Sequence, residues 1–136
     1  MSAPAIRHQS TIYTGPGKAL NLILWVVQVM LALAFLAPSS LKLMGAPVMV
    51  ELFEAVGFGQ WLRYVTGILE LTGVVFIVVP KTRSIGAVLL ATVMLGAIPA
   101  HLFILHTAPT TPVVNLLLSS VVVWGRWREL AHFGGR

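Results

Sequence analysis

The stretch Leu20–Ala37, LNLILWVVQVMLALAFLA, decides the fold class of this 136-residue chain. It holds no charged residue, and only Asn21 and Gln28 interrupt its apolar side chains. A helix needs about 20 such residues to cross the hydrocarbon core of a bilayer. The stretch exceeds the roughly 7–15 apolar residues typical of a cleaved signal peptide. We therefore predict a retained membrane-spanning helix, with a signal peptide as the alternative.

Three further apolar runs follow, and they cover Trp61–Val79, Ile85–Leu105 and Pro112–Trp127. The last run is the shortest, about 24 Å long as a helix. As a span it requires Arg126 and Arg128 to extend their side chains to the interface. Pro112 suits the first turn of its helix, with Thr111 as the cap. The predicted fold is thus an all-α integral membrane four-helix bundle.

One domain accounts for the whole chain. We predict a polar N-terminal tail over residues 1–18, a four-span membrane domain over 19–128 and a C-terminal tail over 129–136. Between the first two spans, Met49–Val56 has the pattern of a short amphipathic helix at the outer interface, ended by Gly57 and Gly59. Pro38 either kinks the first helix or ends it.

The composition excludes several classes of protein. Hydrophobic residues make up 57% of the chain and charged residues only 10%, against about 25% charged in soluble domains. There is no Cys, which excludes disulfides, thiolate zinc sites, iron–sulfur clusters and CxxC redox chemistry. The net charge of +5 comes from residues at the edges of apolar runs rather than from a basic helix. Nucleic acid is therefore not a predicted partner, whereas the lipid bilayer is.

The basic residues also predict the orientation. Seven lie on the side of the N-terminal tail, the turn after the second span and the C-terminus: Arg7, Lys18, Lys81, Arg83, Arg126, Arg128 and Arg136. The other side has only Lys42 and Arg63. Because Lys and Arg accumulate on the cytoplasmic side of a membrane, we predict that both termini are cytoplasmic.

Polar residues inside the runs are the candidate site. Ionisable groups in spanning helices are rare and usually face the bundle interior. Candidates for ligand binding or proton handling are Lys42, Glu70 and His101, followed by Arg63, Gln28 and Asn115. The alternatives remain open: Glu70 as a structural partner, Lys42 and Arg63 at the interface, and Gln28 and Asn115 as hydrogen-bonding contacts between helices.

The position of Glu70 predicts its partner. It lies about 13 Å from either end of its run, on a face with Arg63, Thr66, Gly67 and Gly73, where small residues allow another helix to come close. Lys42 and His101 enter from the outer side to a similar depth. We predict that Glu70 pairs with Lys42, with His101 nearby. No catalytic motif or metal-ligand spacing occurs, so the sequence leaves open whether the protein is an enzyme.

The order of several short motifs resembles the DoxX-like family of small four-span bacterial membrane proteins. The shared elements are Lys42 at the end of the first span, Phe53 and Gly57, Gly67 and Glu70 in the second span, Pro80, Gly86 and Ala87, and Gly96, Ala97 and His101. The resemblance covers residues 20–128. The chain departs from the family at Ser39, where members often carry Gly.

The resemblance implies a multi-pass protein of the bacterial inner membrane near quinone chemistry, because the family takes its name from a subunit associated with thiosulfate:quinone oxidoreduction. It implies a redox-complex subunit with quinone as the candidate cofactor and other membrane or redox proteins as partners. A homo-oligomer remains open. A non-catalytic scaffold or assembly subunit is the alternative, and a small transporter is a weaker one, since no inverted repeat is evident.

Overall fold

The computed structural model describes residues 15–135, which are almost entirely helical. Residues 1–14 of the predicted N-terminal tail lie outside the described range. The elements are α1 (Lys18–Met44), α2 (Pro47–Val56), α3 (Gln60–Val78), α4 (Arg83–Pro99), the π-helical turn η1 (Ala100–Ile104) and α5 (Thr110–Gly134). No strand occurs between residues 15 and 135, which confirms the predicted all-α class.

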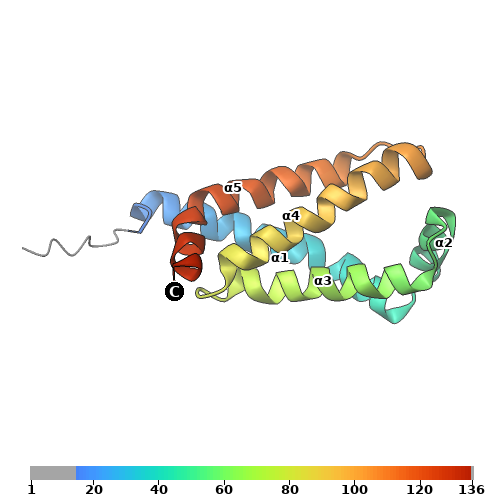
Figure 1. The fold of residues 1–136 in the computed structure, drawn as a ribbon, viewed down its shortest axis with the longest axis horizontal. Coiled ribbons are helices and arrows are strands. Elements are labelled where there is room, and N and C mark those ends of the chain that lie inside the picture. Colours follow the sequence, from blue (N-terminus) through green and yellow to red (C-terminus); the bar gives the residue numbers. More distant parts are fainter. Residues whose placement is uncertain (1–14, 136) are drawn as a thin grey trace, which may run out of the picture.

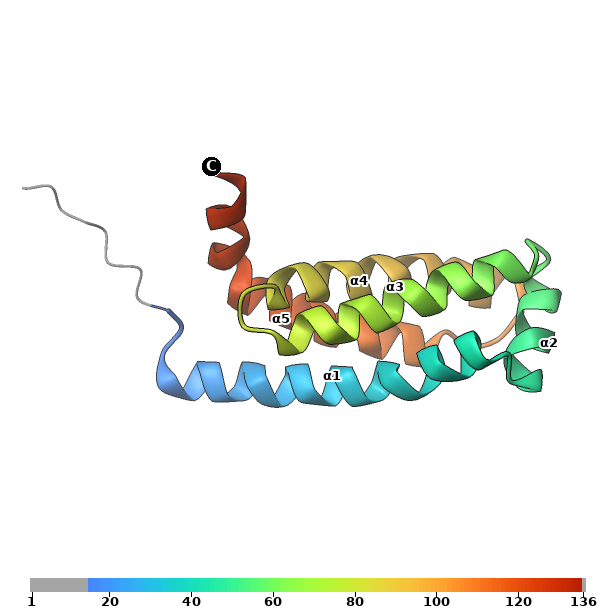
Figure 2. The same ribbon diagram turned by 90° about the horizontal axis from the view of Figure 1, so that it is seen from below.

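The four long helices α1, α3, α4 and α5 run along the length of the molecule in alternating directions, and α2 lies across one end (Figure 1). Each long helix packs on two neighbours, in the order α1, α3, α4, α5 and back to α1. Figure 2 shows α1 along one side and the last turns of α5 bending away from the others. We call the end that carries α2 the α2 end. The termini end is the opposite one, where α1 begins and α5 finishes.

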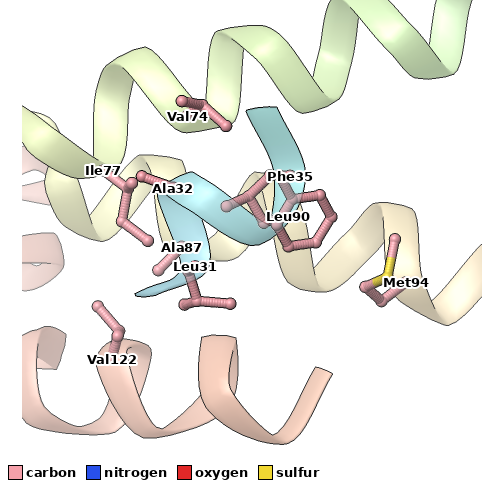
Figure 3. Packing of buried hydrophobic residues seen from close by; sticks show 9 residues of the cluster. All are labelled: Leu31, Ala32, Phe35, Val74, Ile77, Ala87, Leu90, Met94 and Val122. Atoms are coloured by element: carbon pink, nitrogen blue, oxygen red, sulfur yellow. The ribbon is translucent and has the colours of Figure 1, made fainter. Parts of the chain in front are cut away.

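The core lies between the four long helices. All four contribute apolar side chains to one cluster (Figure 3): Leu31, Ala32, Phe35, Val74, Ile77, Ala87, Leu90, Met94 and Val122. At Gly86 the backbone of α4 touches that of α3, because a Cβ there would lie 2.5 Å from the Ile77 nitrogen. The outward faces remain apolar, with Leu33 65% and Leu95 59% exposed. An outer surface of this kind suits lipid rather than water.

Helix α1 continues through Pro38 to Met44. Pro38 has no amide hydrogen for the carbonyl one turn earlier, yet the next two residues support the helix. The Ser39 hydroxyl donates to the Phe35 carbonyl at 2.7 Å, and that of Ser40 donates to the Leu36 carbonyl at 2.7 Å. Ser39 therefore fits within the continuous helix, and Lys42 lies on its last turn.

The third run contains a feature that the sequence analysis did not predict. Pro99 ends α4, and the chain continues as the π-helical turn η1. The Leu105 amide donates to the Ala100 carbonyl five residues earlier, at 2.9 Å. A proline leaves a carbonyl without its usual amide donor, and a wider turn is one way in which a helix adapts to this.

Helix α5 differs from its prediction at both ends. It begins at Thr110 with Pro109 as its cap residue, so Thr111 is not the cap, although Pro112 does lie in the first turn. It continues to Gly134, so most of the predicted C-terminal tail is helical. Within residues 15–135, three helical segments are long and apolar enough to cross a membrane: Lys18–Met44, Gln60–Val78 and Arg83–Ile104. These segments make the chain a multi-pass membrane protein.

Candidate functional site

The predicted pair between Lys42 and Glu70 is confirmed. Lys42 Nζ donates to both carboxylate oxygens of Glu70, each at 2.7 Å. The side chain of Glu70 is 3% exposed and that of Lys42 is 12% exposed. The ion pair therefore joins α1 to α3, and the ammonium is the more accessible of its two groups.

Gly67 allows the two helices to approach beside this pair. A Cβ at Gly67 would lie 3.1 Å from the Leu43 side chain and 3.2 Å from the Lys42 Cβ. A residue larger than Gly would push α1 outward and lengthen the distance that the lysine stem must span. The small-residue face predicted around Glu70 thus serves the close helix contact expected of it.

Arg63 fixes the end of α1. It is 4% exposed, so its guanidinium lies among protein groups rather than on the surface of the bundle. Its Nη1 donates to the Lys42 carbonyl, and its Nε donates to Gln60 Oε1 at 2.7 Å. The guanidinium also lies 4.2 Å from the centroid of the Tyr64 ring. A cation at a helix C-terminus is stabilising because the last carbonyls carry partial negative charge. Arg63 therefore holds the backbone from which Lys42 reaches Glu70.

Gln60 extends these contacts to α2. Its Nε2 donates to the Val50 carbonyl at 3.0 Å while its Oε1 accepts from Arg63. We call Lys42, Gln60, Arg63 and Glu70 the α2-end cluster. Its ion pair and hydrogen bonds connect α1, α2 and α3.

His101 lies in η1 and is half-buried. Its Nδ1 is 2.9 Å from the Thr107 hydroxyl, within the connection to α5. None of the hydrogen bonds among the described residues joins His101 to Lys42 or Glu70. The structure therefore pairs two of the three leading candidates and gives the third a partner of its own.

Gln28 and Asn115, the remaining candidates, lie on other parts of the bundle. Gln28 is fully buried on α1, where its Nε2 donates to the Ile77 carbonyl at 2.8 Å and its Oε1 accepts from Arg126 Nε at 3.2 Å. Asn115 is buried on α5, on the face that also carries Ser119 and Arg126. Gln28 therefore acts as a hydrogen-bonding contact between helices, which was the predicted alternative for it.

A second polar cluster lies at the termini end. Arg126, expected to extend to the interface, is instead 1% exposed, because Asn21 and Gln28 on α1 accept hydrogen bonds from its guanidinium at 2.8 and 3.2 Å. Glu129 lies 3.6 Å from Arg126 Nη1. We call this set the termini-end cluster: Asn21, Gln28, Arg83, Ser84, Arg126 and Glu129.

Glu129 is the acceptor on which this cluster converges. Arg83 donates to it from Nη2 at 2.6 Å and from Nε at 3.0 and 3.2 Å, and the Ser84 hydroxyl donates at 3.0 Å. Burial on its own would raise the pKa of Glu129. The hydrogen bonds from Arg83 and Ser84 and the charges of Arg83 and Arg126 outweigh it, so the pKa lies below the ordinary value.

The sequence offered one usable signal for this second cluster. Arg126 follows Ser119 by seven residues, and Gln28 follows Asn21 by seven residues, so each pair repeats on one helix face. This spacing gives the face of each residue but not the contact between Arg126 and Gln28. The pairing of Arg83 with Glu129 joins residues 46 positions apart, and no spacing rule relates them.

An apolar groove of about 300 Å³ lies at the α2 end, where α3 faces α4 and η1. Its lining includes Phe58, Leu62, Gly96, Pro99 and Phe103. Neither Lys42 nor Glu70 lines it. The groove therefore offers room for an apolar group at the same end of the bundle as the ion pair.

A comparison with family models matches residues 26–125 to the DoxX-like family. The match includes all four spans expected from the sequence in whole or in large part. No curated protein and no solved structure matches the chain significantly.

Proposed function

Because the chain belongs to the DoxX-like family, we propose that it is the membrane subunit of a quinone-linked redox complex and binds a quinone at the Lys42–Glu70 pair. The observation that carries this proposal is the ion pair itself, buried within helices whose outer faces are apolar. Intramembrane ionisable residues are costly and usually functional. A quinone is an apolar ring with polar oxygens, so it suits such a setting.

The chemistry of the pair matches the two states of a quinone. The Lys42 ammonium can donate to a quinone carbonyl, and the Glu70 carboxylate can accept from a quinol hydroxyl. Both bonds to Glu70 come from one flexible lysine stem, so a ligand can replace the ammonium at one oxygen while Arg63 holds the Lys42 backbone. In this proposal the chain binds the quinone and exchanges protons with it, and the electrons pass between the quinone and a partner protein.

The other candidates have places in the same proposal. The groove along Leu62, Pro99 and Phe103 suits the apolar tail of the ligand. His101, through the ring nitrogen that Thr107 does not use, supplies a second polar contact from η1. These two features also make the α2 end the side from which the ligand enters.

A quinone-binding measurement tests the proposal. Purified protein in lipid nanodiscs is titrated with a short-chain ubiquinone analogue, and binding is followed by tryptophan fluorescence. We expect saturable binding that Glu70→Gln weakens about tenfold, the effect of losing one hydrogen bond to a charged group. Glu54→Gln, an exposed change on α2, is the matched control and leaves affinity unchanged. Absence of saturable binding to the unmodified protein would overturn the proposal.

The scaffold alternative rests on a specific observation. Lys42 and Glu70 satisfy each other, and Arg63 and Gln60 extend the contacts to α1 and α2. A scaffold role predicts that Glu70→Gln lowers resistance to unfolding and releases partner proteins without altering quinone binding. Native mass spectrometry of detergent-extracted protein distinguishes the two, because it reports bound small molecules and bound proteins together.

We also propose a four-span topology in the bacterial inner membrane with both termini cytoplasmic. In support, α5 packs along α4 and α1 as a full member of the bundle, and its apolar stretch from Pro112 to Gly125 runs between the two ends. A reporter fused after Arg136 should be active only as a cytoplasmic-type fusion. A periplasmic-type signal contradicts this topology.

A further inference from the structure

A pocket of about 370 Å³ lies at the termini end between the start of α1 and the last turns of α5. Its lining includes Pro16, Leu20, Trp124, Gly125, Trp127 and Arg128. Gly125 lies where α5 comes closest to α1, since a Cβ there would be 2.5 Å from the Leu24 side chain. The pocket is therefore formed by the packing of these two helices.

The end of the bundle that carries this pocket has a net positive charge. Among the described residues, the termini end carries five basic groups against one acidic group: Lys18, Lys81, Arg83, Arg126 and Arg128 against Glu129. The α2 end carries two basic groups against three acidic ones: Lys42 and Arg63 against Glu51, Glu54 and Glu70. Glu129 is already engaged by Arg83 and Arg126, so no acidic group among the described residues of this end is left for the exposed Lys18, Lys81 and Arg128.

Arg128 is the basic residue that faces the pocket. It is exposed, and none of the side-chain hydrogen bonds or ion pairs of residues 15–135 involves its guanidinium. Trp124 and Trp127 lie beside it with 68% and 56% of their surfaces exposed. Tryptophan prefers the headgroup level of a bilayer, where its ring meets both apolar and polar groups. The lining thus combines a cation with the side chains typical of a membrane interface.

We propose that this pocket binds an anionic phospholipid, with the phosphate against Arg128 and the glycerol and upper acyl chain against Leu20, Trp124 and Trp127. Basic pockets between membrane helices bind anionic headgroups in this way. The apolar lining favours a lipid over free phosphate, which would gain nothing from the two indole rings. The inference depends only on membrane insertion and is independent of quinone binding at the opposite end.

Quenching by brominated lipid tests this proposal. In a variant with Trp25→Phe and Trp61→Phe, fluorescence reports on Trp124 and Trp127 alone. Vesicles of phosphatidylcholine and phosphatidylglycerol are prepared in two forms of equal composition, with bromine on one lipid or on the other. We expect phosphatidylglycerol to be enriched about fivefold at these residues, the effect of one basic side chain near an anionic lipid. Equal quenching by the two bromolipids would overturn the proposal.

Variants at exposed basic residues distinguish a specific lipid-binding site from nonspecific electrostatic attraction of anionic lipids. Arg128→Gln should abolish the enrichment, and Arg128→Lys should retain most of it. Lys81→Gln removes an equal charge on the exposed turn between α3 and α4, outside the pocket, and should retain it fully. An equal loss in Lys81→Gln, or displacement of the lipid by inorganic phosphate beyond that caused by chloride of equal ionic strength, contradicts a lipid site.

Discussion

The two polar clusters of the bundle hold buried charges in different ways. In the α2-end cluster, Glu70 receives both of its hydrogen bonds from the single ammonium of Lys42. In the termini-end cluster, Glu129 receives hydrogen bonds from Arg83 and Ser84 and lies within 3.6 Å of Arg126. An acid that is held by one flexible donor can exchange that donor for a ligand. An acid that is held by several donors would have to give up several hydrogen bonds to do so. The comparison supports the proposal of ligand exchange at the α2 end and gives the termini end the more firmly held contacts between helices.

The clusters also join different helices. The α2-end cluster connects α1, α2 and α3, whereas the termini-end cluster connects α1, α4 and α5 and also reaches α3 through the hydrogen bond from Gln28 to the Ile77 carbonyl. Both lie at the ends of the apolar core that Figure 3 shows. Helix α1 supplies side chains to both, so its register decides whether the two clusters form together.

The largest expected effect is that of removing Arg126. Arg126→Met removes a hydrogen-bond donor from the buried Gln28 and a charged partner from the partly buried Asn21 and Glu129, and the loss of such contacts costs of order 4 kcal/mol. Unfolding by SDS in mixed micelles measures it. Arg128→Met, two residues further on at an exposed position, should change the free energy of unfolding by less than about 0.5 kcal/mol. If the two variants unfold alike, the termini-end cluster does not fix the helices.

Breaking the α2-end pair on one side should cost slightly less, because Lys42 is partly accessible. We expect Lys42→Met and Glu70→Gln each to lower the free energy of unfolding by about 3 kcal/mol. The double variant should be milder than the sum by about 2 kcal/mol, since neither charge is then left alone. Lys81→Met with Glu54→Gln, both exposed, is the control cycle and should be additive. An additive result for Lys42 and Glu70 would show that their contact carries no energy.

Two glycines extend the comparison to helix packing. A Cβ on Gly86 would meet the backbone of α3, 2.5 Å from the Ile77 nitrogen, whereas a Cβ on Gly67 would meet side-chain atoms of Leu43 at 3.1 Å. Side chains can give way more easily than backbone, so Gly86→Ala should cost about 2 kcal/mol and Gly67→Ala about 0.5 kcal/mol. The same SDS unfolding measurement compares them. A larger cost at Gly67 would place the tighter helix contact at the α2 end.

The smallest expected effect is that of pH on the termini-end cluster. The pKa of Glu129 is lowered in the folded protein, so its contribution to stability is fully present above the unfolded value of about 4.3. It is lost as the pH falls through the lower folded value. Resistance to SDS should therefore fall on acidification below about pH 4, and Glu129→Gln should flatten that fall. An unchanged acid response in Glu129→Gln contradicts the role of Glu129.

Much of the α2-end cluster could be predicted because its members repeat on helix faces. The spacing of Arg63, Gly67 and Glu70 places them on one side of a helix, and the depth estimate brought Lys42 within reach of Glu70. The role of Arg63 could not be predicted, because it donates to the Lys42 carbonyl. Every helix residue has a carbonyl, so the sequence does not show which carbonyl accepts a hydrogen bond from a side chain.

The π-helical turn and the position of His101 mark another limit. Pro99 predicts a disturbed helix, but not whether the chain kinks, ends or widens its turn. In the structure the chain forms the wider π-helical turn η1 after Pro99, and His101 Nδ1 lies 2.9 Å from the Thr107 hydroxyl. A rotation of this kind moves a side chain around the helix axis, so a depth estimate alone did not locate His101.

The sequence by itself determined the apolar runs, the all-α class, the faces on which polar residues lie and the Lys42–Glu70 pair. These follow from local periodicity and from the cost of isolated charge in a membrane. Only the tertiary structure decided that Arg126 is buried against α1 and that Arg83 meets Glu129 across 46 residues. Those contacts depend on the order in which the helices pack and on where α5 approaches α1 and α4. Periodicity within one helix carries no information about the helix that will face it.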